Sequence, residues 1–384
     1  MRRVLHILNS LERSGMETML LCSAAEWARS GYSCDVLASA ASIGPLAPQM
    51  RAAGYGVFHI PFRSRYRYLP RIRFIADFYR LCGSGYDVVH IHTETATPIL
   101  AILAKLAGVS YIALTPHNTF YFSGLLRARK VLERFLIRLL GGRYGMISNG
   151  VRRCEWENFG NPGVRTWNWL DTSRFRPPTP DERASARQSL GCWPDQFVVV
   201  SVGNCNDVKN HPEILRGLSL LPSSIVPYYL HVGREEANQP ERALAAKLQI
   251  EDKVCFCGSQ EDTREFLWAA DVYVMPSLRE GLSIAAIEAI AAGVPAVLAN
   301  IGGLADVAAE TGFTVLISTT AESIADGIGQ IATIPAEERR RRAHLDSERI
   351  RERFSIRNGV QSLTDGLYRA APAAMPVRSV GTVR

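Results

Sequence analysis

Short apolar segments alternate with helical patterns along most of the chain, and this alternation restricts the fold more than any other feature. Apolar segments in the first half lie at residues 4–8, 34–37, 57–60, 87–92 and 111–115. Helical patterns separate them at 17–30, 70–81 and 97–107. The alternation restarts with apolar segments at 197–202, 228–232, 254–256, 272–275 and 296–299. Strands that alternate with helices form parallel sheets covered on both faces. We therefore predict an α/β fold of two Rossmann-like domains that face each other across a cleft.

A proline-rich segment at residues 175–180 separates the two halves. It reads Phe-Arg-Pro-Pro-Thr-Pro, and three prolines in a short polar stretch break both helix and strand. A length of 384 residues also suits two domains better than one core. We predict an N-terminal domain at 1–174, a C-terminal domain at 175–354 and a loose tail at 372–384. The helix expected at about 355–371 is a candidate for packing back on the N-terminal domain.

Membrane-spanning and secreted classes are not supported by the sequence. No apolar run reaches the roughly 18 residues of a membrane span, and no cleavage site follows the basic N-terminus. The eight cysteines are scattered through apolar segments, which is typical of reduced cytosolic thiols. Cys255 and Cys257 have no second ligand pair at matching spacing, so we predict no metal site. The expected location is the cytoplasm, with the inner face of the membrane as an option.

The net charge of +7 is concentrated in the first half of the chain. Residues 1–175 hold 22 Lys or Arg and 11 Asp or Glu, whereas residues 176–384 hold 22 and 26. One basic stretch mixes Arg63, Arg65, Arg67, Arg71 and Arg73 with Tyr66 and Tyr68. A second follows a helical pattern with Arg127, Arg129, Lys130, Arg134 and Arg138. The second stretch fits either an anionic membrane surface or an ordinary packed helix with a solvated face.

Nucleic-acid binding has little support beyond the net charge. The run Glu-Glu-Arg-Arg-Arg-Arg at 337–342 interleaves with acidic residues in a charged helical segment, which is typical of a solvated helix face. No recognised nucleic-acid-binding motif is present. A nicotinamide-dependent oxidoreductase is also disfavoured, because no Gly-x-Gly-x-x-Gly follows the first strand.

The segment from Pro276 to Glu288 carries the strongest functional signal. It follows a predicted strand and opens a predicted helix, so the backbone at Gly281 and Ser283 would present N–H groups to an anion. Glu280 lies in the turn, where a carboxylate can accept hydrogen bonds from a polyol. Glu288 lies in an apolar stretch, where a charge without a partner is costly.

These residues resemble family 4 retaining glycosyltransferases. Glu280 and Glu288 match the family's E-x7-E motif, and the segments at 291–295 and 302–303 match its flanking sequence. Further matches occur in the family's order at 14–17, 86–92, 115–119, 171–177 and 202–211. The resemblance covers nearly the whole chain and implies the GT-B fold. The segment Ser-Gly-Met-Glu at 14–17 is similar to that of polysaccharide-building bacterial members.

The resemblance also implies roles for individual residues. Glu280 would hold hydroxyls of the donor sugar, Glu288 the ribose hydroxyls, and Lys209 the diphosphate as a point cation. The catalytic residues implied are Glu280, His117 and Lys209, and the donor-binding residues are Gly15, Asn204, Gly281, Leu282, Ser283 and Glu288. No cofactor and no metal are implied. His90 and His92 flank the same cleft, and we interpret them as structural.

Asn204 departs from the family pattern, which has Arg after Val-Gly. Asn keeps a hydrogen-bond donor but loses the charge and fork geometry of Arg. Slower chemistry, an altered donor or a binding-only protein are the alternative consequences of this change. Arg234 is a candidate to replace the missing arginine charge.

The sequence therefore predicts a metal-independent retaining glycosyltransferase. It would move a hexosyl group from a nucleotide sugar, with a UDP-sugar as the first candidate, to a polysaccharide, lipid-linked or small-molecule acceptor. The alternatives are a GT-B sugar-nucleotide 2-epimerase and a non-catalytic protein that binds nucleotide sugars. We expect no nucleic-acid partner, and peripheral membrane contact would involve the basic N-terminal domain.

Overall fold

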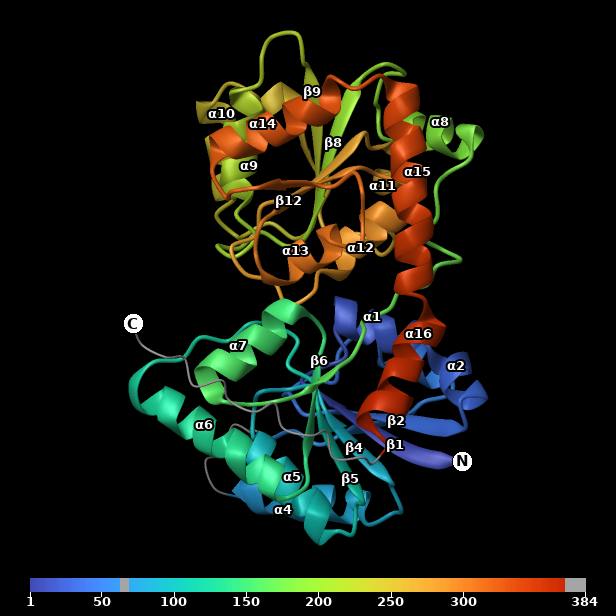
Figure 1. Ribbon diagram of the computed structural model, residues 1–384, viewed down its shortest axis with the longest axis vertical. Coiled ribbons are helices and arrows are strands. Elements are labelled where there is room, and N and C mark those ends of the chain that lie inside the picture. The colour runs from blue at the N-terminus through green and yellow to red at the C-terminus, as the bar shows by residue number, and fades with distance from the viewer. Residues whose placement is uncertain (63–68, 370–384) are drawn as a thin grey trace, which may run out of the picture.

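A computed structural model describes residues 1–62 and 69–369, which form two lobes joined end to end (Figure 1). Each lobe contains one parallel sheet flanked by helices, so the predicted two-domain α/β architecture is confirmed. The tail at 372–384 and residues 63–68 of the first basic stretch lie outside the described residues. The domain boundaries at 174 and 354 stay predictions.

The N-terminal lobe is built on a seven-stranded sheet in the order β3-β2-β1-β4-β5-β6-β7. Its strands are β1 (Arg2–Leu8), β2 (Tyr32–Ala38), β3 (Gly56–His59), β4 (Val88–Ile91), β5 (Tyr111–Leu114), β6 (Arg143–Met146) and β7 (Val164–Arg165). Its helices are α1 (Gly15–Cys22), α2 (Ala24–Arg29), α3 (Ala47–Ala52), α4 (Leu69–Cys82), α5 (Thr97–Leu106), α6 (Gly124–Leu139) and α7 (Asn149–Phe159). The central strands β1 and β4 are buried along nearly their whole length, as expected for a sheet with helices on both faces.

The C-terminal lobe is built on a six-stranded sheet in the order β10-β9-β8-β11-β12-β13. Its strands are β8 (Phe197–Val202), β9 (Pro227–Val232), β10 (Val254–Phe256), β11 (Val272–Met275), β12 (Ala296–Ala299) and β13 (Val315–Ile317). Its helices are α8 (Pro180–Ser189), α9 (His211–Ser219), α10 (Pro240–Lys247), α11 (Arg264–Ala269), α12 (Ile284–Ala291), α13 (Gly302–Ala308), α14 (Ala321–Ala332) and α15 (Ala336–Arg353), with a short 3-10 helix at Glu251–Lys253. In both sheets the parallel strands point their carboxyl ends toward one edge, where ligands of such folds bind.

The helix predicted at 17–30 is wrong as a single element. It is divided at Ser23 into α1 and α2. The Ser23 hydroxyl donates to the carbonyl of Leu20 at 2.8 Å and accepts from the indole N–H of Trp27 at 3.0 Å. A serine side chain that bonds to nearby backbone competes with the helical hydrogen bonds, which explains the break.

The chain returns to the N-terminal lobe after α15. Ser355 pairs with Leu170, and α16 (Ile356–Gln361) continues into a π-helical turn at Ser362–Leu367. Tyr368 is fully buried there, stacked on Trp27 at a ring distance of 6.2 Å. The C-terminal segment therefore completes the hydrophobic core of the first lobe.

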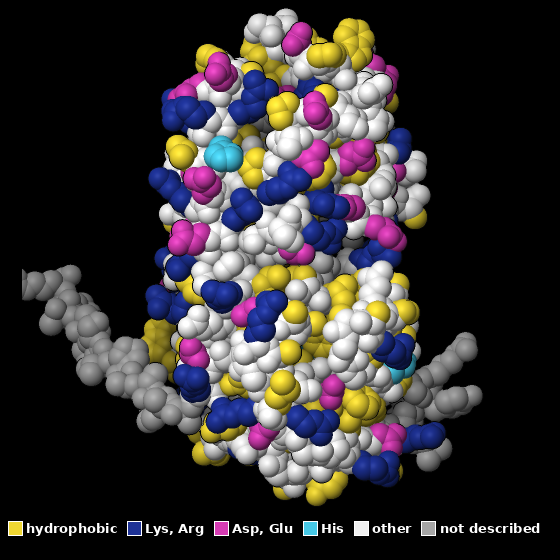
Figure 2. All heavy atoms as spheres, turned by 90° about the vertical axis from the view of Figure 1, so that its right-hand side faces the viewer, with side chains coloured by type: hydrophobic (Ala, Val, Ile, Leu, Met, Phe, Trp, Pro, Cys, Tyr) yellow, Lys and Arg dark blue, Asp and Glu magenta, His cyan; other side chains and the backbone are white. Residues whose placement is uncertain are grey.

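Helix α15 has a mixed-charge solvent face. Arg341 and Arg342 both form ion pairs with Glu338 on the same helix. Figure 2, which views the side of the molecule that carries α15, shows basic and acidic side chains intermixed over that lobe. The arrangement fits the predicted solvated face except at Arg339, which is buried and pairs with Asp271 at 3.0 Å. None of the described helices is long and apolar enough to span a membrane.

Candidate active site

The carboxyl edges of the two sheets meet through backbone contacts at glycines. A Cβ atom at Gly281 would collide with the carbonyl oxygen of His117, which belongs to the other lobe. Within the C-terminal lobe, a Cβ atom at Gly303 would collide with the carbonyl oxygen of Gly281. Gly150 at the start of α7 likewise abuts Gly302 at the start of α13. Only residues without a side chain allow this approach, so the glycines bring both lobes to one site.

Lys209 and Glu280 form the central ion pair of this site. Lys209 lies in the loop after β8, Glu280 lies in the loop after β11, and Lys209 Nζ is 2.6 Å from Glu280 Oε1. Both side chains are mostly buried, with exposures of 23% and 15%. Two residues 71 positions apart in sequence, each predicted to contact the same ligand, are therefore in direct contact.

Glu288 lies one turn into α12, behind Glu280. No ion pair to its carboxylate is present among the described residues, and burial raises its pKa to about 8. The charge of Arg174 acts against this rise in pKa, but Arg174 pairs with Asp262 at 3.2 Å. The side chain is half-buried, and a carboxyl with a pKa raised this far holds its proton at neutral pH and can donate or accept a hydrogen bond.

The start of α12 offers backbone groups rather than side chains. The Ser283 hydroxyl caps the helix by accepting from the N–H of Ala286 at 3.3 Å and also contacts the Met275 sulfur at 3.1 Å. Leu282 is buried, with 6% exposure. The contribution that remains for a ligand is the free N–H groups and the positive end of the helix.

Asn204 and Gly15 approach the site from opposite lobes. Asn204 is exposed, and its Oδ1 accepts from the backbone N–H of Arg234 at 2.9 Å. The amide N–H groups of Asn204 therefore remain available to a ligand. The exposed Arg234 side chain is also available, because no ion pair to it is present among the described residues. Gly15 begins α1, and a Cβ there would lie 3.0 Å from Ile284 of α12. The first lobe therefore contacts the start of α12 through Gly15.

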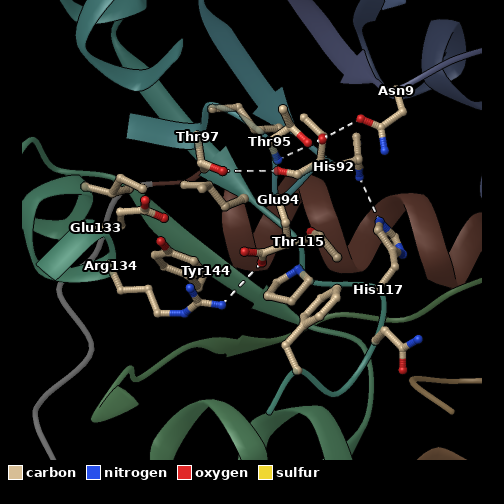
Figure 3. A pocket seen from close by; sticks show the side chains of 17 residues that line it. Asn9, His92, Glu94, Thr95, Thr97, Thr115, His117, Glu133, Arg134 and Tyr144 are labelled. Carbon is tan, nitrogen blue, oxygen red and sulfur yellow. Dashed lines mark hydrogen bonds and ion pairs between the residues drawn. The ribbon is translucent and has the colours of Figure 1, made fainter. Parts of the chain in front are cut away.

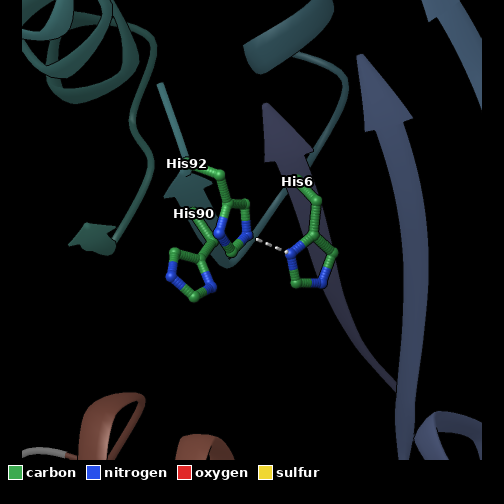
Figure 4. Close-up of side chains that lie close together, drawn as sticks. All are labelled: His6, His90 and His92. Carbon is green, nitrogen blue, oxygen red and sulfur yellow. Dashed lines mark hydrogen bonds between the residues drawn. The ribbon is translucent and has the colours of Figure 1, made fainter. Parts of the chain in front are cut away.

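His117 belongs to a row of histidines that sequence reasoning did not connect. His117 follows β5, and its Nε2 lies 2.9 Å from Nδ1 of His92, which follows β4. His92 Nε2 in turn lies 3.0 Å from Nδ1 of His6 on β1 (Figure 4). His90 is separate from this row, because it bonds Tyr368 at 2.7 Å and Thr115 at 2.8 Å. Adjacent strands β1, β4 and β5 bring these rings together, a relation that the sequence alone does not display.

Two cavities flank the site. One of about 240 Å³ lies in the N-terminal lobe beside His92, Glu94 and His117 (Figure 3). Another of about 280 Å³ lies between the lobes, where Glu280, Arg279 and Gly302 face residues of α7 and the loop before α6. A ligand held by the Lys209–Glu280 pair would therefore have open space toward both lobes.

Helix α6 differs from the predicted amphipathic arrangement. Its buried side carries Lys130, Glu133 and Arg134, not only apolar residues. Arg134 forms a two-pronged ion pair with Glu155 at 2.7 Å and reaches Glu94 at 3.2 Å (Figure 3). Lys130 and Arg134 are therefore not surface cations, because carboxylates from distant segments hold them inside.

Two groups of described residues place metal-ligand atoms within 4.8 Å of one another: His6 with His90 and His92, and Cys205 with His211 and His231. In the first group, the 3.0 Å separation of His6 and His92 is that of a hydrogen bond. In the second, His231 Nε2 lies 3.5 Å from Cys205 Sγ and 3.1 Å from the carbonyl oxygen of Gly203, which is not part of the group. Cys255 and Cys257, the cysteine pair considered in the sequence, belong to neither group.

Comparison with known proteins places these features in a family. The model for "Glycosyl transferases group 1" matches residues 182–345, and that for "Glycosyl transferase 4-like domain" matches residues 14–147. The chain belongs to glycosyltransferase family 4. The enzyme is 26% identical over 314 residues to EpsF of Bacillus subtilis (strain 168), a protein named as a glycosyltransferase. The matched region covers 78% of this chain and 79% of EpsF.

Two further relatives bear on fold and ligands. An Escherichia coli UDP-Gal:alpha-D-GlcNAc-diphosphoundecaprenol alpha-1,3-galactosyltransferase is 25% identical, covering 57% of this enzyme and 59% of that protein. HepE from Anabaena, solved in complex with UDP and glucose, superposes with a TM-score of 0.81 at 17% identity, covering 95% of this chain and 99% of HepE. The likeness of this glycosyltransferase to HepE confirms the predicted GT-B fold.

Proposed function

We propose that this glycosyltransferase transfers a hexosyl group from a UDP-sugar with retention of anomeric configuration. The observation that supports the proposal is the Lys209–Glu280 pair, which lies beside the backbone contact of Gly281 with His117. Lys209 binds the diphosphate, Glu280 the sugar hydroxyls and Glu288 the ribose. The UDP moiety is favoured because HepE was solved with UDP and with UDP-glucose.

The chemical step needs stabilisation of charge on the leaving diphosphate. Lys209 supplies one positive charge, and the N-terminus of α12 supplies N–H groups and a partial positive charge. The acceptor hydroxyl attacks from the face that the diphosphate leaves, and the departing phosphate oxygen takes its proton. No protein base is then required, which suits a site where desolvation lowers the pKa of His92 and of His117.

The acceptor is proposed to be a lipid-linked sugar. This assignment draws on the Escherichia coli relative, whose name specifies a diphosphoundecaprenol acceptor, and on the surface of helices α4, α5 and α6. Exposed large apolar side chains gather there: Ile72, Ile75 and Tyr79 on α4, Ile99, Ile102 and Leu106 on α5, and Leu125, Leu126, Leu132, Phe135, Leu136 and Leu139 on α6.

Helix α6 supports a partner at this surface. Lys130 and Arg134 point inward and pair with carboxylates, while Leu125 is 91% and Leu139 72% exposed. Arg127 and Arg129 are exposed on the same helix. An apolar face with basic residues beside it matches the interface of an anionic lipid membrane.

The anomeric outcome tests the reaction. We expect transfer from a UDP-sugar in the presence of EDTA, with a product whose anomeric proton coupling matches that of the donor. An inverted product would contradict the retaining assignment.

Vesicle flotation tests the membrane surface. We expect binding to vesicles with anionic lipid at low salt, and loss of binding in the double variant Leu132→Ser, Phe135→Ser. The matched control is Trp193→Ser, since Trp193 is 76% exposed on the other lobe. Equal binding by all three proteins, or no binding by the wild type, would contradict the proposal.

A further inference from the structure

The row His6–His92–His117 is a continuous hydrogen-bonded chain of three imidazoles. His92 uses both ring nitrogens, Nε2 toward His6 Nδ1 at 3.0 Å and Nδ1 toward His117 Nε2 at 2.9 Å. His6 lies on β1, and the other two rings follow β4 and β5. The chain therefore runs from the core of the first lobe to the loop that contacts Gly281.

All three rings are neutral at physiological pH. Burial lowers the pKa of His6 to about 3 and that of His117 to about 4, and it holds the pKa of His92 well below its usual value. A neutral imidazole has one N–H donor and one acceptor nitrogen. Both hydrogen bonds must therefore point in the same direction along the chain, because His92 can donate only once.

The unpartnered end of the chain selects the direction. His6 Nε2 is buried and has no hydrogen-bond partner. If the bonds pointed from His117 to His6, this nitrogen would carry a buried N–H without an acceptor. If they point from His6 to His117, it carries only an unused lone pair. Buried N–H groups without partners are rarer in proteins than acceptors without partners, so the second direction is favoured.

We propose that His6 and His92 are positioning residues that fix His117 as the tautomer with its proton on Nδ1. His6 Nδ1–H donates to His92 Nε2, and His92 Nδ1–H donates to His117 Nε2. The free N–H of His117 is then on Nδ1, so the ring is a neutral hydrogen-bond donor. His117 Nδ1–H would donate to a hydroxyl of the bound sugar, and this last step alone rests on the proposed function.

The tautomer is measured directly by long-range ¹H–¹⁵N correlation spectra of the whole protein labelled at histidine, with the His117 signals assigned by their loss in His117→Gln. The expected wild-type pattern is a protonated Nδ1 and an unprotonated Nε2 at His117. A protonated Nε2 at His117 would overturn the proposal, whatever the activity. If the expected tautomer is found but no sugar nucleotide is turned over, the proposed function fails and the tautomer assignment stands.

Substitutions at His6 separate positioning from structure. His6→Asn keeps an N–H donor at the place of Nδ1, whereas His6→Leu removes it. We expect a mixture of His117 tautomers in His6→Leu, with kcat lowered up to about tenfold at little change in KM, and the wild-type tautomer and rate in His6→Asn. Equal His117 spectra in the two variants would overturn the proposal. If His6→Leu does not fold, the tautomer seen in the wild-type spectrum decides whether the proposal stands.

Discussion

Lys209 Nζ lies 2.6 Å from Glu280 Oε1, so the cation and the carboxylate that we assign to different parts of one donor neutralise each other before it binds. A diphosphate must displace Glu280 from Lys209, and the sugar hydroxyls must then satisfy Glu280. The pair therefore links diphosphate binding to sugar binding. A ligand with the diphosphate but without the sugar would separate the pair and leave Glu280 without a partner.

The Glu280→Gln variant tests this link through product binding. The amide cannot hold Lys209 as an ion pair, so we expect UDP to bind about two- to fivefold more tightly than to wild type. Isothermal titration calorimetry with UDP measures the change. Weaker UDP binding in Glu280→Gln would show that the carboxylate does not compete with the diphosphate.

Lys209 should matter for the chemical step. Removing a preorganised charge from a leaving group typically lowers kcat by about 10²–10³, and we expect a loss of this size in Lys209→Ala. Initial-rate kinetics measure it, and Lys247→Ala is the control because Lys247 is exposed on α10. A kcat for Lys209→Ala within threefold of the control (roughly 0.7 kcal/mol) would remove Lys209 from the mechanism.

Gly281→Ala should separate the two lobes without unfolding either. The added Cβ would collide with the carbonyl oxygen of His117, and backbone on both sides leaves little room to yield. We expect loss of transfer and a larger radius of gyration by small-angle X-ray scattering. The control is Gly329→Ala in α14, where the new Cβ meets nothing within 4 Å and should stabilise the helix by about 0.5–1 kcal/mol. Full activity of Gly281→Ala would disprove the tight contact.

Glu288 should make stability fall with rising pH. Burial raises its pKa from the ordinary 4.5 to about 8, so between these values the folded protein binds a proton that the unfolded chain has lost. The free energy of unfolding then decreases by up to about 1.4 kcal/mol per pH unit as the pH rises through this window. The contribution of Glu288 to stability is therefore largest below pH 4.5. Urea denaturation of wild type and Glu288→Gln at pH 5.5 and 8.5 measures the difference. An unchanged pH dependence in Glu288→Gln would contradict the assignment.

The sequence predicted the elements whose signals are local. Strands β8, β10, β11 and β12 have the predicted bounds, because each is a short apolar run followed by a turn or helix start. Glu280 and Glu288 stood out because one lies in a loop before a helix and the other within an apolar stretch.

What the sequence did not reveal depends on contacts between distant segments. Lys130 and Arg134 looked like surface cations, but their partner Glu94 lies about forty positions away and draws both inward. His6 gave no functional signal, since its neighbour His92 is 86 positions later and meets it only through the pairing of β1 with β4. The break at Ser23 is a local effect instead, because its hydroxyl bonds the Leu20 carbonyl, and helix periodicity does not encode that bond.

Donor hydrolysis tests the central claim most directly. The enzyme would be incubated without added metal with a panel of UDP-, GDP-, ADP- and dTDP-sugars, and released nucleotide and sugar would be followed by mass spectrometry for wild type and Glu280→Gln. We predict slow release of UDP from one UDP-sugar by the wild type and loss of that release in Glu280→Gln. Equal release by both proteins, release of a different nucleotide, or a product epimerised at C2 would contradict the account.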